Sequence, residues 1–173
     1  MQRTRGSCSR ARAGLAQGRV REPTKEPIVL DVNTTMLISA PPAEVWRAIT
    51  DLGGHDAWNP LMRRFSGGLE PGGRIRFSIR LGPVWLPVSA RVMTVDAERE
   101  LRWAGPALSA AHPLARGEHW FRLSADADGG TRFDHGERWS GLVPRALWRV
   151  IGPPLHEGYE AMNRALARRV QAG

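Results

Sequence analysis

The C-terminal segment carries the clearest helical pattern in the chain. Between residues 154 and 172, apolar side chains recur at steps of four, three, four and four. The recurring positions are Leu155, Tyr159, Met162, Leu166 and Val170. This spacing places them on one stripe of an α-helix, and Pro154 suits the first helical position, where a missing N–H loses no hydrogen bond. An amphipathic helix of this length must bury its stripe against another element.

Most of the preceding sequence alternates between apolar and polar residues, which indicates β-strands. The clearest case is 74–81, where four apolar positions alternate with Arg74, Arg76, Ser78 and Arg80. This pattern predicts a strand with one buried face and a solvated, arginine-bearing face. A first strand is predicted at 32–38, which is rich in β-branched residues. Further strands, separated by turn sequences, are predicted at 61–65, 85–95, 101–104, 119–123 and 131–139.

Three other segments favour helices or turns. Pro41 and Pro42 open a predicted helix that continues over 43–52. Residues 51–60 are too short and too interrupted by glycine for a long helix, so we interpret them as a loop or a single helical turn that directs Trp58 inward. Residues 143–151 predict a short helix that ends at 152–154, Gly-Pro-Pro, before the C-terminal helix begins.

The order of these elements predicts an α+β fold. One strand and one helix precede six strands in meander, and the long helix follows them. A curved antiparallel sheet around a single helix leaves a gap where the two layers separate. Gaps of this kind, lined by apolar side chains and a few polar ones, are frequent ligand sites.

The net charge of the chain does not change this prediction, because most of the charge lies in the N-terminal segment. The 173 residues carry a formal charge of +8, but residues 1–27 alone account for +5 of it. The remainder is not strongly basic, so no specific nucleic-acid partner is expected. We interpret residues 1–27 as a disordered basic extension or an over-long start assignment, with an organelle transit peptide as the alternative, and residues 28–173 as a single ligand-binding domain.

Cysteine content and hydropathy set further bounds. Cys8 is the only cysteine, so no intrachain disulfide can form. No stretch approaches the roughly 18 consecutive apolar residues of a membrane span, and no apolar run after the early arginines indicates a secretory signal. We therefore expect a cytoplasmic protein with no membrane span, and the frequent arginine, alanine and glycine are typical of a GC-rich bacterial genome.

Two groups of motifs carry a family resemblance. The first is Ile-Ser-Ala-Pro-Pro-Ala-Glu-Val-Trp at 38–46, followed by Trp-Asn-Pro at 58–60. The second is His-Gly-Glu-Arg-Trp-Ser-Gly-Leu at 135–142 and Gly-Tyr-Glu-Ala-Met-Asn at 158–163. Over residues 31–171 the chain resembles the START-like, or SRPBCC, helix-grip superfamily, and within it the bacterial polyketide cyclase/dehydrase and lipid-transport-like group. The resemblance implies a curved antiparallel sheet wrapped around a long C-terminal helix, with an internal hydrophobic cavity and no cofactor; it does not supply a reaction.

His135 and Glu137 are the sharpest candidates for chemistry. They lie two residues apart on a predicted strand and therefore share a face with Phe133 and Trp139. A buried carboxylate or imidazole needs a partner. The pair is interpreted as binding a polar ligand group or moving a proton, or, alternatively, as satisfying each other or a backbone group at the sheet rim.

His119 is predicted to approach His135 from the neighbouring strand. Two histidines and a glutamate could suggest a metal site, but nothing in their spacing establishes ligand geometry, so we expect no metal. No Gly-x-Ser-x-Gly motif marks a nucleophile, and the glycine pairs lack the lysine and hydroxyl residue of a phosphate loop. No residue is assigned as catalytic.

The remaining candidates line or cap the expected cavity. The full set of predicted ligand-binding residues is Trp58, Phe77, His119, Phe121, His135, Glu137, Trp139, Tyr159 and Met162.

The leading hypothesis is binding, transport or sequestration of a small hydrophobic or amphipathic molecule. The first alternative is a cyclase, aldol or dehydratase-type enzyme with His135 and Glu137 as acid and base. The second is an interaction module that contacts a chaperone, another protein, nucleic acid or an acidic membrane. The oligomeric state is not determined by the sequence.

Overall fold

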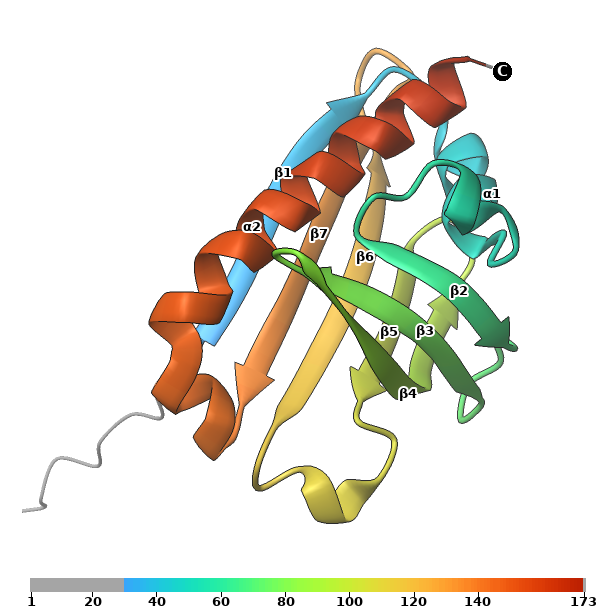
Figure 1. Cartoon of the computed structure of the whole chain (residues 1–173). Helices are drawn as coiled ribbons and strands as arrows, with labels where there is room; N and C mark the ends of the chain where they lie inside the picture. Colours follow the sequence, from blue (N-terminus) through green and yellow to red (C-terminus); the bar gives the residue numbers. More distant parts are fainter. Residues whose placement is uncertain (1–29, 173) are drawn as a thin grey trace, which may run out of the picture.

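The computed structural model describes residues 30–172, so the predictions for residues 1–27 and Cys8 lie outside the described residues. A single antiparallel sheet of seven strands curves around one long helix, α2 (Leu142–Gln171) (Figure 1). The strands are β1 (Leu30–Ile38), β2 (Met62–Gly67), β3 (Arg74–Leu81), β4 (Val84–Asp96), β5 (Glu100–Gly105), β6 (Arg116–Ala125) and β7 (Thr131–Ser140). Helix α1 (Pro42–Thr50) and the short 3-10 helices η1 (Gly54–Ala57) and η2 (Ser109–Ala111) complete the described fold. The predicted α+β helix-grip architecture is confirmed.

Strands β2 to β7 follow the predicted meander, and the first strand, β1, is added at the edge of the sheet beside β7. Their order across the sheet is β1-β7-β6-β5-β4-β3-β2, so β1 pairs with the last strand of the chain. The sheet bends strongly, and β2 to β4 lie at a steep angle to β1 and β7 (Figure 1). Helix α2 runs along the concave face over β1 and β7 (Figure 1).

Alternation along β3 behaves as its sequence predicts. Ile75 and Phe77 are buried in the core, whereas Arg74, Arg76 and Arg80 are exposed. The core lies between the concave sheet face and the apolar stripe of α2, where Leu155, Tyr159, Met162 and Leu166 are buried. These two apolar faces supply most of the apolar area removed from water, which is the main driving force for folding.

The predicted break before the C-terminal helix is wrong. Helix α2 is continuous through Pro153 and Pro154, although it bends near its beginning (Figure 1). Each proline removes one hydrogen bond to the carbonyl four residues earlier. Those carbonyls belong to Arg149 and Val150, which are exposed, so water can satisfy them. The prolines therefore bend the helix without ending it.

The predicted helical turn after α1 is present as η1, but its fully buried side chain is His55, and Trp58 is half-buried. The His55 Nε2 donates to the Ile49 carbonyl at 3.0 Å, and the Asn59 Nδ2 donates to His55 Nδ1 at 2.9 Å. Burial lowers the pKa of His55, which keeps the ring neutral. Sequence periodicity missed His55 because the turn is too short to show a face.

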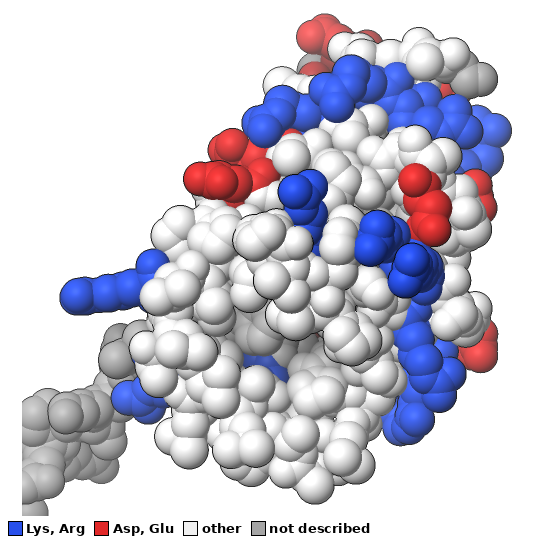
Figure 2. Space-filling model, viewed as in Figure 1, with Lys and Arg blue, Asp and Glu red and all other residues white. Residues whose placement is uncertain are grey.

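Charge is unevenly distributed over the surface. Figure 2 shows arginines gathered around the upper end and one side, whereas the lower part of the same face is largely uncharged and hollowed. Among the described residues, no helix is both long enough and apolar enough to span a lipid bilayer.

Candidate functional site

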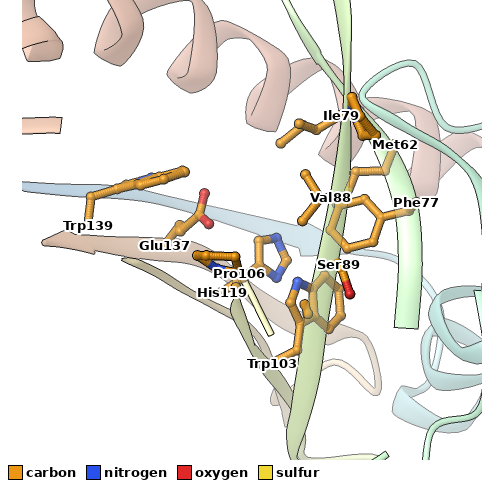
Figure 3. Close-up of a pocket in the computed structure, with 13 residues that line it drawn as sticks. Met62, Phe77, Ile79, Val88, Ser89, Trp103, Pro106, His119, Glu137 and Trp139 are labelled. Atoms are coloured by element: carbon orange, nitrogen blue, oxygen red, sulfur yellow. The ribbon is translucent and has the colours of Figure 1, made fainter. Parts of the chain in front are cut away.

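A cavity of about 180 Å³ lies between the bent strands and the end of β7. Its lining residues come from six neighbouring strands and the loop after β5. They are Met62, Phe77, Ile79, Pro87, Val88, Ser89, Ala90, Trp103, Gly105, Pro106, His119, Glu137 and Trp139. Most of this wall is apolar; Glu137 and His119 lie at one edge, where β6 and β7 pair, and Ser89 lies on β4 (Figure 3).

Glu137 is the acidic group at that polar edge. It lies directly opposite His119 in the β6–β7 register and is 8% exposed. The Tyr159 hydroxyl on α2 donates a hydrogen bond to its Oε2. Burial raises the pKa of the Glu137 carboxyl to about 7, although the hydrogen bond from Tyr159 opposes the shift. The carboxyl therefore exists in both protonation states near neutral pH.

A glycine on β6 makes room for this carboxyl. A Cβ placed on Gly117 would collide with Glu137 Oε1 and would also lie 3.3 Å from the Trp139 ring. The absent side chain at Gly117 thus lets Glu137 and Trp139 lie side by side against the strand. Glu137 fits this position because Gly117, the register partner of Trp139 on β6, has no side chain.

The two predicted histidines meet across the β6–β7 hairpin. His119 Nε2 and His135 Nε2 are 2.9 Å apart, and His135 Nδ1 is 2.8 Å from Asn163 Oδ1 on α2. Burial lowers the pKa of His135 to about 3, and burial together with the neighbouring His135 lowers the pKa of His119 well below its ordinary value. Both rings are therefore neutral at physiological pH.

Aromatic stacking fixes both imidazole rings. Trp103 stacks on His119 with ring centroids 4.3 Å apart, and Tyr159 stacks on His135 at 4.1 Å. The interplanar angles are 11° and 9°. Because stacked rings cannot rotate without losing contact with their neighbours, the nitrogen atoms of both histidines are held in fixed directions.

Two buried polar atoms of the cavity wall have no hydrogen-bond partner among the described residues. They are His119 Nδ1 and Trp139 Nε1. Leaving a buried polar group unpaired is unfavourable by about 1–3 kcal/mol. Such atoms at the wall of a cavity provide ready positions for polar groups of a ligand. In the part of the chain that the structure describes, no cluster of three or more acidic, histidine or cysteine side chains is arranged to hold a metal ion.

Sequence comparison assigns this architecture to a family. The profile of the family described as "Polyketide cyclase / dehydrase and lipid transport" matches residues 29–173. The chain belongs to this family. The match spans the whole described sheet and helix, including every lining residue of the cavity, and it confirms the resemblance seen in the sequence motifs. A search of curated proteins finds no significant match.

Solved structures with the same fold extend across distant members of the helix-grip class. Protein TTHA0849 of Thermus thermophilus is 20% identical, with a TM-score of 0.66 over 82% of this chain and 97% of that one. The ZhuI aromatase/cyclase of Streptomyces sp. R1128 is 14% identical, with a TM-score of 0.68 over 83% and 94%. A norcoclaurine synthase of Thalictrum flavum, solved with a transition-state analogue, is 11% identical, with a TM-score of 0.63 over 85% and 97%. At these identities, the likeness shows the fold.

The structure separates the nine predicted site residues of this family member into three groups. Four of them line the cavity, namely Phe77, His119, Glu137 and Trp139. Four others are buried next to them without lining it, namely Phe121, His135, Tyr159 and Met162. Trp58 lines a different hollow, between α1 and the end of α2.

Two groups of functional residues were missed at the sequence level. Val88 and Ser89 belong to the wall, and their strand was predicted without any indication of which face meets the cavity. Asn163 was missed although its position was informative. It lies four residues after Tyr159 and therefore occupies the apolar stripe of α2, where a polar side chain requires a buried partner.

Proposed function

We propose that this protein binds a small, mainly apolar molecule with a polar end in the cavity that strands β2 to β7 line. The observation that carries the proposal is an apolar wall with one edge where Glu137, His119 and Trp139 line the cavity and where His119 Nδ1 and Trp139 Nε1 have no hydrogen-bond partner among the described residues. Burial of an apolar part of the ligand against this wall favours binding. Hydrogen bonds from the ligand to the two unpartnered nitrogen atoms at the same edge would favour it further.

The size of the cavity restricts the buried part of the ligand. A cavity of about 150 Å³ lined by apolar side chains accepts benzene, and the cavity here measures about 180 Å³. The enclosed part is therefore expected to be a single ring or a compact branched chain. A longer molecule would extend through the opening, where the surrounding surface in Figure 2 is largely uncharged.

The proposal is tested by closing the cavity. Val88 lines it on β4, whereas Leu86, two residues earlier on the same strand, does not. We expect Val88→Trp to abolish binding of small aromatic probes in isothermal titration, and Leu86→Trp to leave it unchanged. Native mass spectrometry of the purified protein, followed by extraction, identifies any molecule that co-purifies. Equal binding by wild type and Val88→Trp would contradict the proposed site.

An enzymatic function is the second candidate, and the state of Glu137 favours it. A carboxyl whose pKa is raised by burial to about 7 can both donate and accept a proton at neutral pH. His135 has both ring nitrogens engaged and does not line the cavity, so the histidine that faces a substrate alongside Glu137 is His119. Because one protein with this fold is an aromatase/cyclase, cyclase-type chemistry is the first class to assay.

Binding and catalysis are separated by a conservative variant. If Glu137 transfers a proton, Glu137→Gln abolishes turnover of a substrate while its dissociation constant changes little. If the protein only binds, the same substitution leaves no reaction to lose and affects affinity alone. Product analysis by mass spectrometry with a ligand identified from the purified protein distinguishes the two.

A further inference from the structure

A chain of hydrogen bonds leads from the backbone of β7 to the wall of the cavity. It begins at Thr34 on β1, whose Oγ1 is 3.0 Å from the carbonyl oxygen of His135. A carbonyl oxygen can only accept, so the Thr34 hydroxyl must donate to it. The same hydroxyl oxygen is 2.9 Å from Asn163 Nδ2, and it accepts from that amide. The orientation of the Asn163 side chain is thereby fixed.

This orientation determines the proton position on each histidine. With its Nδ2 directed at Thr34, Asn163 presents Oδ1 to His135 Nδ1 at 2.8 Å, so that nitrogen carries the hydrogen. A neutral imidazole has one N–H, which leaves His135 Nε2 as an acceptor. His119 Nε2, 2.9 Å away, must therefore donate. The remaining nitrogen of His119, Nδ1, is left with a lone pair.

The series of hydrogen bonds ends at an unpartnered atom of a residue that lines the cavity. His119 is 2% exposed, it lines the cavity, and its Nδ1 accepts no hydrogen bond from any described residue. Neither Glu137, which lies opposite it, nor Trp103, which stacks on it, donates to this atom. A hydrogen-bond acceptor is thus held in a fixed direction with no donor.

We infer that Thr34, Asn163 and His135 form a directional relay that holds His119 Nδ1 as a permanent acceptor, and that the ligand of the cavity carries a hydroxyl donor, of the phenol or enol class, at this point. The inference rests on the proposed function and specifies its ligand. A carbonyl or ether oxygen placed at the same point would meet the lone pair of His119 and leave the nitrogen unpaired. Thr34, Asn163 and His135 are positioning residues that act through His119.

The proton positions are tested directly by NMR. Nitrogen-15 spectra of the histidine rings distinguish a protonated from an unprotonated nitrogen. Comparison with His119→Phe and His135→Phe assigns the two rings among the five histidines. We expect His119 to carry its hydrogen on Nε2 and His135 to carry it on Nδ1. The reverse pattern, or a charged ring at neutral pH, would overturn the inference whatever the ligand.

The ligand class is tested with phenol and anisole, which differ by one methyl group on the oxygen. The wild-type protein is expected to bind phenol about fivefold more tightly, the effect of one net hydrogen bond. His119→Phe keeps an aromatic ring at the site and is expected to abolish this preference, and the ratio between the two proteins cancels effects of probe size. Equal affinity of wild type for both probes would overturn the inference but leave the proposed cavity standing. Binding of neither probe would overturn both.

The relay itself is tested far from the ligand. Thr34→Val keeps the side-chain shape but removes the hydroxyl that orients Asn163, so the amide can rotate and both tautomers of His119 become accessible. The phenol preference should fall and the NMR pattern should become mixed, although the protein remains folded. Thr35→Val is the matched control, because Thr35 is exposed and donates to Asp134 instead. Unchanged tautomers in Thr34→Val would exclude the relay.

Discussion

The surroundings of Glu137 determine the pKa of its carboxyl. Its carboxyl is buried beside the unpartnered indole of Trp139, receives one hydrogen bond from Tyr159 and occupies space that Gly117 leaves free. No basic side chain forms an ion pair with it among the described residues. Burial therefore dominates, and it raises the pKa of this carboxyl from 4.5 to about 7.

This shift predicts a pH-dependent difference in stability between wild type and Glu137→Gln. The folded protein holds the proton more tightly than the unfolded chain, so the wild type loses stability as pH rises from about 4.5 to about 7. Relative to the variant, the loss should reach about 3 kcal/mol above pH 7. Urea unfolding of both proteins at pH 5 and pH 8 measures it, and a difference that does not change with pH would contradict the pKa shift.

The buried histidines act in the opposite direction in both proteins. The pKa of His135 is lowered by burial to about 3, so the unfolded chain binds its proton more tightly, and stability rises with pH from about 3 to 6.5. Because wild type and Glu137→Gln share these histidines, subtracting their unfolding free energies removes this contribution. The remaining slope belongs to Glu137.

At the scale of elements, α2 brings the polar groups of the site onto the sheet. Tyr159 reaches Glu137 on β7, and Asn163 reaches both His135 on β7 and Thr34 on β1. The two residues are four positions apart, so they lie one above the other on the same helix face. Close approach of α2 to its neighbours is therefore a condition for the site.

Two glycines of α2 provide a matched test of that approach. A Cβ on Gly158 would lie 2.6 Å from Leu61 Cδ1, which is buried, whereas a Cβ on Gly152 would lie 3.2 Å from Trp148, which is half-buried and can move. We expect Gly158→Ala to destabilise the protein by about 1–3 kcal/mol through overpacking. Gly152→Ala should be neutral or slightly stabilising, because alanine favours the helix by about 1 kcal/mol. Chemical denaturation measures both, and equal effects would contradict the close contact at Gly158.

At the scale of the whole molecule, the bend of the sheet creates the cavity. The helix covers β1 and β7, the strands β2 to β4 turn away from them, and the space between is only partly filled (Figures 1 and 3). A ligand in this space touches strands from both ends of the meander. Its binding should therefore stabilise the complete fold and not one element alone.

Thermal unfolding measures this coupling. A ligand at 100 times its dissociation constant stabilises the folded state by about 2.7 kcal/mol, which corresponds to a rise in Tm of roughly 5–10 °C for a domain of this size. We expect the same rise for the full chain and for residues 28–173, and none for Val88→Trp. A rise that disappears when residues 1–27 are removed would indicate that the N-terminal segment contributes to the site and would favour the interaction hypothesis.

Local sequence determined most of the fold. Alternation along 74–81 and 131–139, together with the stripe on the C-terminal helix, specified which residues face the core, because side-chain direction repeats with a period of 2 in strands and 3.6 in helices. The same rule placed His135 and Glu137 on one face and brought His119 beside them, and both statements hold in the structure. The family resemblance followed from motifs that span these elements.

Tertiary structure decided which of the inward residues meet the cavity. His135 and Glu137 share a face of β7, yet His135 is enclosed by Asn163 and Tyr159, whereas Glu137 lines the cavity. The tertiary structure also decided that α2 continues through its two prolines, because the carbonyls left free belong to exposed residues. The direction of the relay to His119 depends on contacts between residues 101 and 129 positions apart. Periodicity gives the direction of a side chain from its own strand or helix, but the distance between two elements depends on how all of them pack.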